Sequence, residues 1–136
     1  MKLNDCHNFE DFRKLAKKKL PSPIFHYIDG GADDEVTLNR NTSSFNDYDL
    51  VPSVLNDVSN IDMSTTVLGE KIDFPLFPAA TAMHRLYHHE GERASAKATE
   101  KMGTIFGTST MGTVSIEEIA KINKGPKLFQ LYIHKD

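Results

Sequence analysis

The chain has 136 residues, a formal net charge of -3 and a single cysteine, Cys6. This slight acidity gives no general attraction to nucleic acid or to anionic membranes. One cysteine cannot form an internal disulfide, so we expect a reducing compartment. No run of about 18 apolar residues occurs and the N-terminus lacks the apolar core of a secretory signal, so we expect no transmembrane segment.

Residues 1–46 are predicted to form a cap of short helices. Asn8 suits the N-cap of a first helix and Ser22 that of a second, because each precedes apolar residues at helical spacing. A third helix, capped by Asp33 or Asp34, is predicted to follow. The N-terminal part therefore provides helices rather than strands.

Residues 47–72 are interpreted as a connector. One proline and a stretch rich in Asn, Asp and Ser argue against a long regular element. The stretches 65–68 and 71–72 flank Gly69-Glu70 and predict a two-stranded hairpin.

Residues 73–136 alternate between short apolar runs and helical segments. The five predicted elements are strand 74–78, helix 90–102, strand 104–106, helix 115–121 and strand 127–133. Such alternation predicts βαβ units, a parallel sheet and an α/β fold. Ligands of these sheets lie beyond the carboxyl ends of the strands, where residues 79–83, the polar turn 107–110, Ser109 within it and Tyr132 fall.

The last predicted strand contains the apolar run 128–133, and Asp136 follows almost at once. A strand at this place would leave an unpaired apolar edge, which proteins avoid. Three strands and two helices also make only part of an α/β barrel, which has about 250 residues. We therefore expect the chain to be the N-terminal part of a longer protein. The alternative is a small three-layer domain that is complete by itself.

Five blocks occur in order between about Phe9 and Asp136: FHYIDGGADDEVTLNRN, NDVSNIDMSTTVLGEKIDFPLFPAATAM, HHEGERASAKA, GTIFGTST and FQLYIHKD. Together they resemble the FMN-dependent α-hydroxy-acid dehydrogenase and oxidase family. The resemblance implies the N-terminal part of a (β/α)8 TIM barrel preceded by short helices. It also implies FMN as cofactor and oxidation of an L-2-hydroxy acid to the 2-oxo acid, with lactate as the first candidate and glycolate as the second.

The family resemblance also sets expectations for partners and location. We expect a small 2-hydroxy acid as substrate and a homo-oligomeric full-length protein, and we expect no nucleic-acid partner. The expected location is the cytoplasm, either free or peripheral at the inner face of a membrane. The electron acceptor stays open between oxygen, a cytochrome and a quinone.

Two tyrosines match substrate-binding positions of the family. Tyr27 matches the tyrosine that hydrogen-bonds the substrate carboxylate, and its alternative role is to pack its ring against Phe25 or Ile28. Tyr132 matches the tyrosine near the substrate hydroxyl. Gln130 and Tyr132 are two residues apart on a predicted strand, so we expect their side chains to share one face.

Five residues match cofactor-binding positions of the family. Ala80, Thr81 and Ala82 match a turn, more often Pro-Thr-Ala, that packs on the reactive face of the flavin. Small side chains there let the backbone approach a flat ring. Ser109 matches a residue at the isoalloxazine edge, and Gln130 one at the pyrimidine edge.

No catalytic residue and no metal site are expected in this segment. His88, His89 and Glu90 are adjacent, and no third ligand has suitable spacing. Glu90 and Glu92 instead suit the positive end of the following helix. The resemblance places the base histidine, the substrate-binding arginines, the lysine near flavin N1 and the phosphate site on later strands.

Two alternatives to a flavin enzyme stay open. The chain could be a non-catalytic partial barrel, acting as a fragment or an interaction module. It could also belong to another α/β-barrel enzyme that has no flavin.

Overall fold

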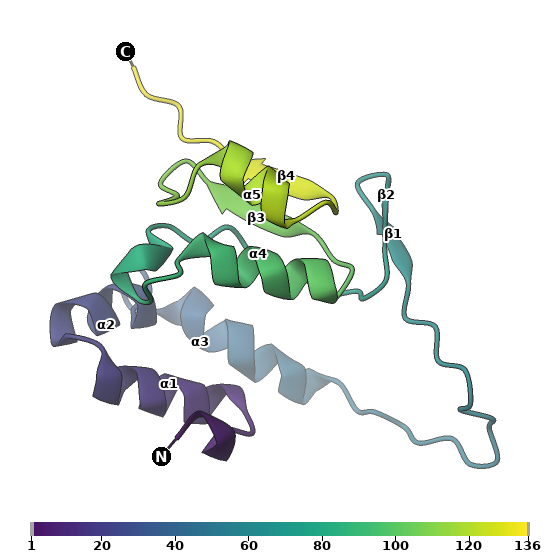
Figure 1. The fold of residues 1–136 in the computed structure, drawn as a ribbon. Coiled ribbons are helices and arrows are strands. Elements are labelled where there is room, and N and C mark those ends of the chain that lie inside the picture. The colour runs from purple at the N-terminus through teal and green to yellow at the C-terminus, as the bar shows by residue number, and fades with distance from the viewer. Residues whose placement is uncertain (1, 136) are drawn as a thin grey trace. The chain divides into compact units, whose positions relative to one another are not determined.

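The computed structural model describes residues 2–135, and these divide into two compact units between residues 56 and 57. Among these residues the first unit holds the helices α1 (Phe9–Lys19), α2 (Ser22–Asp29) and α3 (Val36–Ser43). The second unit holds β1 (Thr65–Val67), β2 (Glu70–Ile72), α4 (Glu92–Lys101), β3 (Phe106–Ser109), α5 (Ile116–Ile122) and β4 (Lys127–Gln130) (Figure 1). None of the described helices has the length and apolar character needed to cross a bilayer.

Helices α1 and α2 form a packed pair within the first unit. The side chain of Asn8 caps α1 by accepting the N–H of Asp11 at 2.9 Å, as its sequence position predicts. Arg13 of α1 makes two hydrogen bonds to the carboxylate of Asp29, at 2.5 Å and 2.9 Å, next to the C-terminus of α2. Phe25 is buried in this unit. A cap and a bidentate ion pair thus fix the first two helices.

The third helix begins later than the sequence predicts. Its N-cap is Glu35, which has a left-handed backbone with φ of 57°, so neither Asp33 nor Asp34 caps it. The Glu35 carboxylate accepts the N–H of Gly31 at 3.0 Å and closes the turn before the helix. Ser22 also differs from expectation, because it is the first residue inside α2 rather than its cap.

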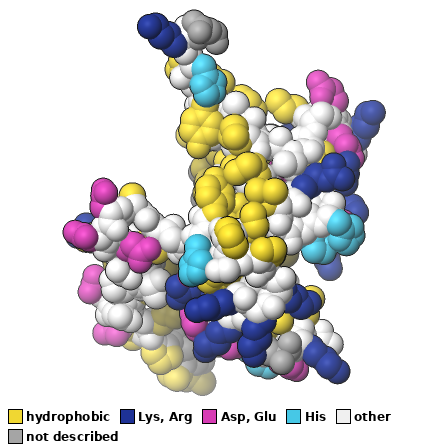
Figure 2. Space-filling model, turned by 90° about the vertical axis from the view of Figure 1, so that its left-hand side faces the viewer, with side chains coloured by type: hydrophobic (Ala, Val, Ile, Leu, Met, Phe, Trp, Pro, Cys, Tyr) yellow, Lys and Arg dark blue, Asp and Glu magenta, His cyan; other side chains and the backbone are white. Residues whose placement is uncertain are grey.

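A long extended segment follows the 3-10 helix η2 (Ser44–Asp47) and leads to the hairpin (Figure 1). Its large apolar side chains are exposed: Tyr48, Leu50, Val51, Val54, Leu55, Val58 and Ile61. Hydrophobic side chains also reach the surface on the face of the molecule that is drawn in Figure 2. Burial within the described residues therefore does not hold this segment in place.

Strands β1 and β2 pair antiparallel, with Val67 opposite Glu70. The turn consists of Leu68 and Gly69, with φ of 53° and 86°. Positive φ at both central residues is the geometry of a type I′ hairpin turn, whose twist matches that of the strands. The turn therefore lies one residue earlier than the predicted Gly69-Glu70.

Strands β3 and β4 form a parallel pair that α4 and α5 cover on one face. The register places Phe106 opposite Lys127 and Ser109 opposite Gln130. Phe106 packs with Ala96 of α4 and with Ile119 of α5 in a buried cluster. Because side chains alternate along a strand, Ser109 belongs to the face away from these helices.

Residues 74–78, predicted as the first strand of the sheet, do not form a strand in the structure. The N–H of Leu76 donates to the carbonyl of Phe74 at 2.8 Å, which bends the chain. The carbonyl groups of Phe74 and Leu76 both accept hydrogen bonds from the Thr104 hydroxyl, at 3.3 Å and 2.7 Å respectively. The two prolines of the stretch have no N–H for a ladder. The segment is therefore held beside the sheet without being paired to it.

The other two predicted strands form at shifted positions. The N–H of Phe106 donates to the carbonyl of Pro126 at 3.1 Å, just before β4, so pairing begins there rather than at 104–106. Residues 107–109, predicted within a turn, consequently belong to β3. The third strand ends at Gln130 and does not continue to residue 133.

Candidate functional site

The carboxyl ends of β3 and β4 meet at one edge of the sheet, and their last residues form the centre of the candidate site. The Ser109 hydroxyl donates to Oε1 of Gln130 at 3.2 Å and accepts the N–H of Met111 at 3.1 Å. Because the Met111 N–H occupies an acceptor position of this hydroxyl, its proton is directed toward Gln130. The structure thus brings together two residues that were predicted to line a flavin.

Tyr132 lies beyond the end of β4, so the predicted common strand face for Gln130 and Tyr132 is wrong. The Thr110 hydroxyl donates to the Gln130 carbonyl at 2.7 Å and accepts the Tyr132 N–H at 3.0 Å. A side chain therefore takes the N–H that a further ladder bond would have used, and pairing stops. Tyr132 is tethered by its backbone to the same edge, and the residue is 49% exposed.

Gly107 lets the backbone of the loop 78–80 approach β3 closely. A Cβ on Gly107 would lie 2.8 Å from the N atom of Ala80 and 3.2 Å from the carbonyl oxygen of Pro78. The first distance is shorter than any side chain tolerates without movement of the backbone. Ala80 is therefore placed directly against the middle of β3.

A hollow of about 440 Å³ opens beside this contact. It is lined by Phe77, Pro78, Ala79, Ala80, Gly107, Leu128, Phe129 and Gln130. Two of the five predicted cofactor residues, Ala80 and Gln130, line it directly, and Ser109 is joined to it through its hydrogen bond to Gln130. The walls are mostly apolar, and one amide is the main polar group, which suits a flat ring with a polar edge.

Thr81 and Ala82 follow on the loop that leaves this hollow. The Thr81 hydroxyl donates to the carbonyl of Ala79 at 3.3 Å. Met83 has a left-handed backbone with φ of 53°, and its N–H donates to the carbonyl of Met111 at 3.0 Å. This bond joins loop 79–83 to loop 109–113, and we call these loops together with the ends of β3 and β4 the site edge.

Thr81 lines a second hollow, of about 260 Å³, on the α4 side of its loop. The hollow is also lined by His84, Tyr87, His88, Gly91, Ala94 and Ser95. The Ser95 hydroxyl and Nδ1 of His84 lie 3.3 Å apart. Within residues 2–135 no group of three or more His, Cys, Asp or Glu side chains is arranged to hold a metal ion.

Glu92, the first residue of α4, bonds to the site edge and was missed by sequence reasoning. The residue is 1% exposed, and its carboxylate accepts hydrogen bonds from the N–H of His84, and from the N–H and hydroxyl of Thr113. Burial opposes the ionisation of Glu92, but the hydrogen bonds from Thr113 and His84 outweigh it and hold its pKa below the usual value. A glutamate directly after a glycine at a helix start was the available signal, and it was attributed to the helix dipole alone.

Tyr27 belongs to the first unit, apart from the other predicted site residues, which are all in the second. It lies on α2 and is 58% exposed, whereas the neighbouring Phe25 is buried. Ring packing within its own unit therefore covers less than half of Tyr27.

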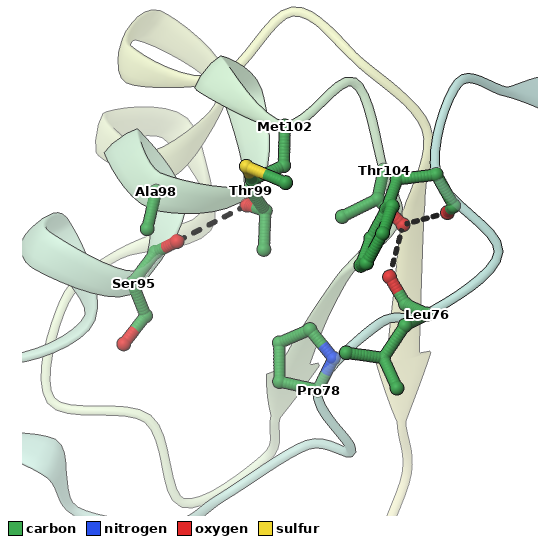
Figure 3. A pocket seen from close by; sticks show the side chains of 8 residues that line it. Leu76, Pro78, Ser95, Ala98, Thr99, Met102 and Thr104 are labelled. Atoms are coloured by element: carbon green, nitrogen blue, oxygen red, sulfur yellow. Dashed lines mark hydrogen bonds between the residues drawn. The ribbon is translucent and has the colours of Figure 1, made fainter. Parts of the chain in front are cut away.

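An apolar groove of about 260 Å³ lies between α4 and the segment 74–78 (Figure 3). Met102, Leu76 and Pro78 line it together with Thr99 and Thr104, whose hydroxyl groups are turned to backbone carbonyls. None of the predicted site residues lines this groove.

Comparison with known proteins places these observations in a family. The model of the family described as FMN-dependent dehydrogenase matches residues 16–136. Glycolate oxidase 3 of Arabidopsis thaliana is 44% identical over 129 residues, which are 95% of this chain and 35% of the relative. The chain therefore spans about a third of the length of the curated relatives it matches.

Solved structures agree with the sequence comparison. A Pediococcus acidilactici protein described as a lactate oxidase superposes with a TM-score of 0.85 at 33% identity, over 97% of this chain and 37% of that one. A soluble mutant of the membrane-associated (S)-mandelate dehydrogenase of Pseudomonas putida gives a TM-score of 0.82 at 37% identity, over 93% and 36% of the two chains.

These structures confirm the fold class expected from the sequence, the N-terminal part of a (β/α)8 barrel preceded by short helices. In such barrels helices alternate with parallel strands, as α4, β3, α5 and β4 do here. FMN is the cofactor of the matching family. The chain belongs to the family of FMN-dependent dehydrogenases that includes the α-hydroxy-acid oxidases.

Proposed function

We propose that the whole protein is an FMN-dependent oxidoreductase that converts a small L-2-hydroxy acid into the 2-oxo acid. The observation that carries the proposal is the site edge, where the Ser109–Gln130 pair lies beside the close-packed backbone of Ala80. The family supports it independently. Because the chain spans about a third of its relatives, the activity is proposed for the whole protein.

The side chains of the site edge fit the isoalloxazine ring of FMN. When bound, FMN supplies the group that accepts the α-hydrogen of the substrate. Ala79, Ala80 and Gly107 form a wall without long side chains, as a flat ring requires. The residues proposed to contact the ring are Ala80, Thr81, Ala82, Ser109 and Gln130.

The role of Gln130 follows from the direction of its hydrogen bonds. Its Oε1 accepts the proton of the Ser109 hydroxyl, which fixes the orientation of the amide. No residue among 2–135 accepts a hydrogen bond from its Nε2. The amide N–H groups are therefore available to donate to a carbonyl oxygen, such as those at the pyrimidine edge of a flavin.

Tyr27 and Tyr132 are proposed to position the substrate. A phenol is a neutral donor on an apolar ring, so it can bond a carboxylate or hydroxyl without adding charge. The bond from the Tyr132 N–H to Thr110 holds its backbone at the site edge, while its half-exposed ring is free to meet a ligand. The base that takes the hydroxyl proton is proposed to come from the rest of the protein.

The acid is proposed to be glycolate or L-lactate. The sequence analysis ranked lactate first, and the Pediococcus protein described as a lactate oxidase supports that acid. The curated relatives named glycolate oxidase support glycolate. The two acids differ by one methyl group, so the difference in kcat/KM is expected to be about ten- to hundredfold at most.

The test is to purify the full-length protein and measure bound FMN and the oxidation of glycolate, L-lactate and D-lactate. We expect a stoichiometric flavin, turnover of at least one of the first two acids, and no turnover of D-lactate. A colourless protein that neither binds added FMN nor oxidises any of these acids would contradict the proposal. It would then support the non-catalytic alternative.

The tyrosines are tested by removing only their hydroxyl groups. Tyr132→Phe is expected to lower kcat while the flavin content stays normal. Tyr27→Phe should lower kcat/KM about ten- to hundredfold, the effect of one hydrogen bond to a charged group. Tyr48→Phe, a change at another exposed tyrosine of the first unit, is the matched control and should leave both quantities unchanged. Unchanged kcat/KM in Tyr27→Phe would leave that residue only a packing role.

Assembly and location are proposed from the family alone. We propose a homo-oligomer in the cytoplasm, either free or peripheral at the inner face of a membrane. Light scattering of the purified protein and fractionation of cells at low and high salt test these points. A monomeric protein in light scattering would contradict the homo-oligomer. A protein that stays in the same cell fraction at both salt concentrations would contradict peripheral attachment to a membrane.

A further inference from the structure

Glu92 connects the two loops of the site edge without lining the hollow between them. Its Oε1 accepts the N–H of Thr113 at 2.7 Å and the N–H of His84 at 3.3 Å. Its Oε2 accepts the Thr113 hydroxyl at 2.6 Å. His84 follows the loop of Ala80, Thr81 and Ala82, whereas Thr113 follows the loop of Ser109. One buried carboxylate therefore binds both proposed flavin loops at once.

The hydrogen-bond directions favour a carboxylate over an amide at this position. The Thr113 hydroxyl accepts the N–H of Arg85 at 3.2 Å, so it donates its own proton to Glu92. The carboxylate thus meets three donors and no acceptor. A glutamine could keep its oxygen toward the two backbone N–H groups and donate from its NH2 to the Thr113 oxygen, but the Thr113 proton would then lose its acceptor. An amide of the same shape leaves at least one of these groups without a partner.

The backbone around Glu92 is adapted to bring the loops close together. Gly91 has φ of 56°, and a Cβ there would lie 2.5 Å from Cγ of Arg85 and 3.4 Å from the hydroxyl oxygen of Thr113. Only glycine fits this conformation and this approach. The bond from the Met83 N–H to the Met111 carbonyl is a second link between the same loops. The two loops are therefore linked to each other at two points, through Glu92 and through the Met83–Met111 backbone bond.

We propose that Glu92 is a positioning residue for the flavin, which sets the separation of loops 79–83 and 109–113 so that both contact one ring. The inference rests on the proposed function, because it assigns a purpose to the hydrogen bonds of Glu92 at that same site. Glu92 is given no contact with the cofactor or the substrate. Its effect on them passes through the backbone of His84 and Thr113.

The experiment uses the full-length protein and four single variants. Glu92→Gln keeps the shape and removes the charge, and Thr113→Val removes only the hydroxyl at an exposed position. Thr113→Ser restores that hydroxyl. Glu90→Gln is the matched control, because Glu90 lies two residues away and its carboxylate forms an ion pair with the exposed Lys97, at 3.7 Å. The measurements are the FMN dissociation constant of the apoprotein, the visible circular dichroism of bound flavin, and the melting temperature of the apoprotein.

We expect Glu92→Gln and Thr113→Val to raise the FMN dissociation constant about tenfold, as the loss of a hydrogen bond to a charged group predicts. The visible circular dichroism of the flavin should change in both, because the ring contacts loops with an altered separation. Thr113→Ser and Glu90→Gln should bind FMN like the unmodified protein. Recovery in Thr113→Ser would show that the hydroxyl, and not the shape of the side chain, is responsible for the effect.

Unchanged affinity and an unchanged flavin spectrum in both Glu92→Gln and Thr113→Val would overturn the inference. So would a lower melting temperature with unchanged flavin binding at temperatures where the variants are folded, since that is the result of a purely structural role. If Glu92→Gln does not fold, the Thr113→Val and Thr113→Ser pair decides the question. If the unmodified protein takes up no FMN, the proposed function fails, and the inference fails with it.

Discussion

The two ends of the β3–β4 layer both contain buried polar side chains, but they use them differently. At the site edge, Glu92 and Ser109 bond to loops and leave the Nε2 of Gln130 free to meet a ligand. At the opposite edge, where β3 and β4 begin, Asn123 is fully buried and turns its Nδ2 to the carbonyl of Ala96 and to the hydroxyl of Thr99. At the opposite edge the amide donors are therefore bonded within the protein, whereas at the site edge an amide donor is left for a ligand.

The turn before β4 also satisfies its polar groups within the protein, here at an exposed position. One oxygen of Glu100 accepts the N–H of Lys124 at 2.7 Å and the N–H of Gly125 at 3.2 Å. This carboxylate fixes the chain where it enters the sheet, as Glu92 fixes it where it leaves. In barrels of this type ligands bind at the carboxyl ends of the strands, and the other end serves stability. We therefore expect changes at the opposite edge to affect folding, and changes at the site edge to affect the flavin as well.

The largest expected effect is that of Asn123→Asp at the opposite edge. The change removes both Nδ2 bonds and places a charge at a site with 0% exposure, which should lower the free energy of unfolding by about 3–5 kcal/mol. Denaturant unfolding of the full-length protein measures this, with exposed Asn41→Asp as control. At a temperature where the variant is folded, its FMN affinity should be unchanged. A tenfold loss of affinity in the folded variant would break the comparison.

Glu92 should make the site edge sensitive to acid. Its folded pKa lies below the unfolded value of 4.5, so its stabilising contribution is complete above that pH and is lost as the pH falls through the folded pKa. At pH 7 we expect Glu92→Gln to lower the free energy of unfolding by about 1.5–3 kcal/mol. This gap should close as the pH falls below 4.5. A gap of constant size down to pH 3 would contradict the assignment.

Gly107→Ala tests the close approach of the loop to β3. The new Cβ would lie 2.8 Å from the backbone N of Ala80, so the loop must move, at a cost of about 1–3 kcal/mol of stability. FMN affinity should fall together with stability. Gly125→Ala is the control at the opposite edge, because its nearest atom would be Oδ1 of Asn123 at 3.4 Å. Equal loss of FMN affinity in both variants would show that the edges do not differ.

The smallest expected effect concerns the ion pair between α4 and α5, whose two residues do not line the hollow beside Ala80. Arg93 donates two hydrogen bonds to Glu118, at 2.5 Å and 3.1 Å, and both side chains are partly exposed. A double-mutant cycle with Arg93→Ala and Glu118→Ala should give a coupling free energy of about 0.2–1 kcal/mol, decreasing at high salt. FMN affinity should not change. A coupling of several kcal/mol would mean that this partly exposed pair holds the two helices together more strongly than surface ion pairs usually do.

Features that depend on neighbouring residues were predictable from the sequence. Asn8 caps α1, and Ser115, the predicted start of its helix, caps α5 by accepting the N–H of Glu118. The alternation of elements gave the α/β class, and the resemblance to a family gave the barrel and FMN. Such signals are local, because a cap needs only the amides of the next turn and periodicity needs only one helix face.

Features that depend on distant partners were decided by the tertiary structure. Ser109 belongs to β3 because pairing starts at Pro126, and β4 ends at Gln130 because the Thr110 hydroxyl takes the next N–H. In the sequence, Glu92 looks the same as a glutamate that stabilises a helix dipole. Only its contact with Thr113, 21 residues away, makes it a buried link between two loops. Composition and spacing determine which elements form, whereas the partners of buried polar groups depend on how those elements pack.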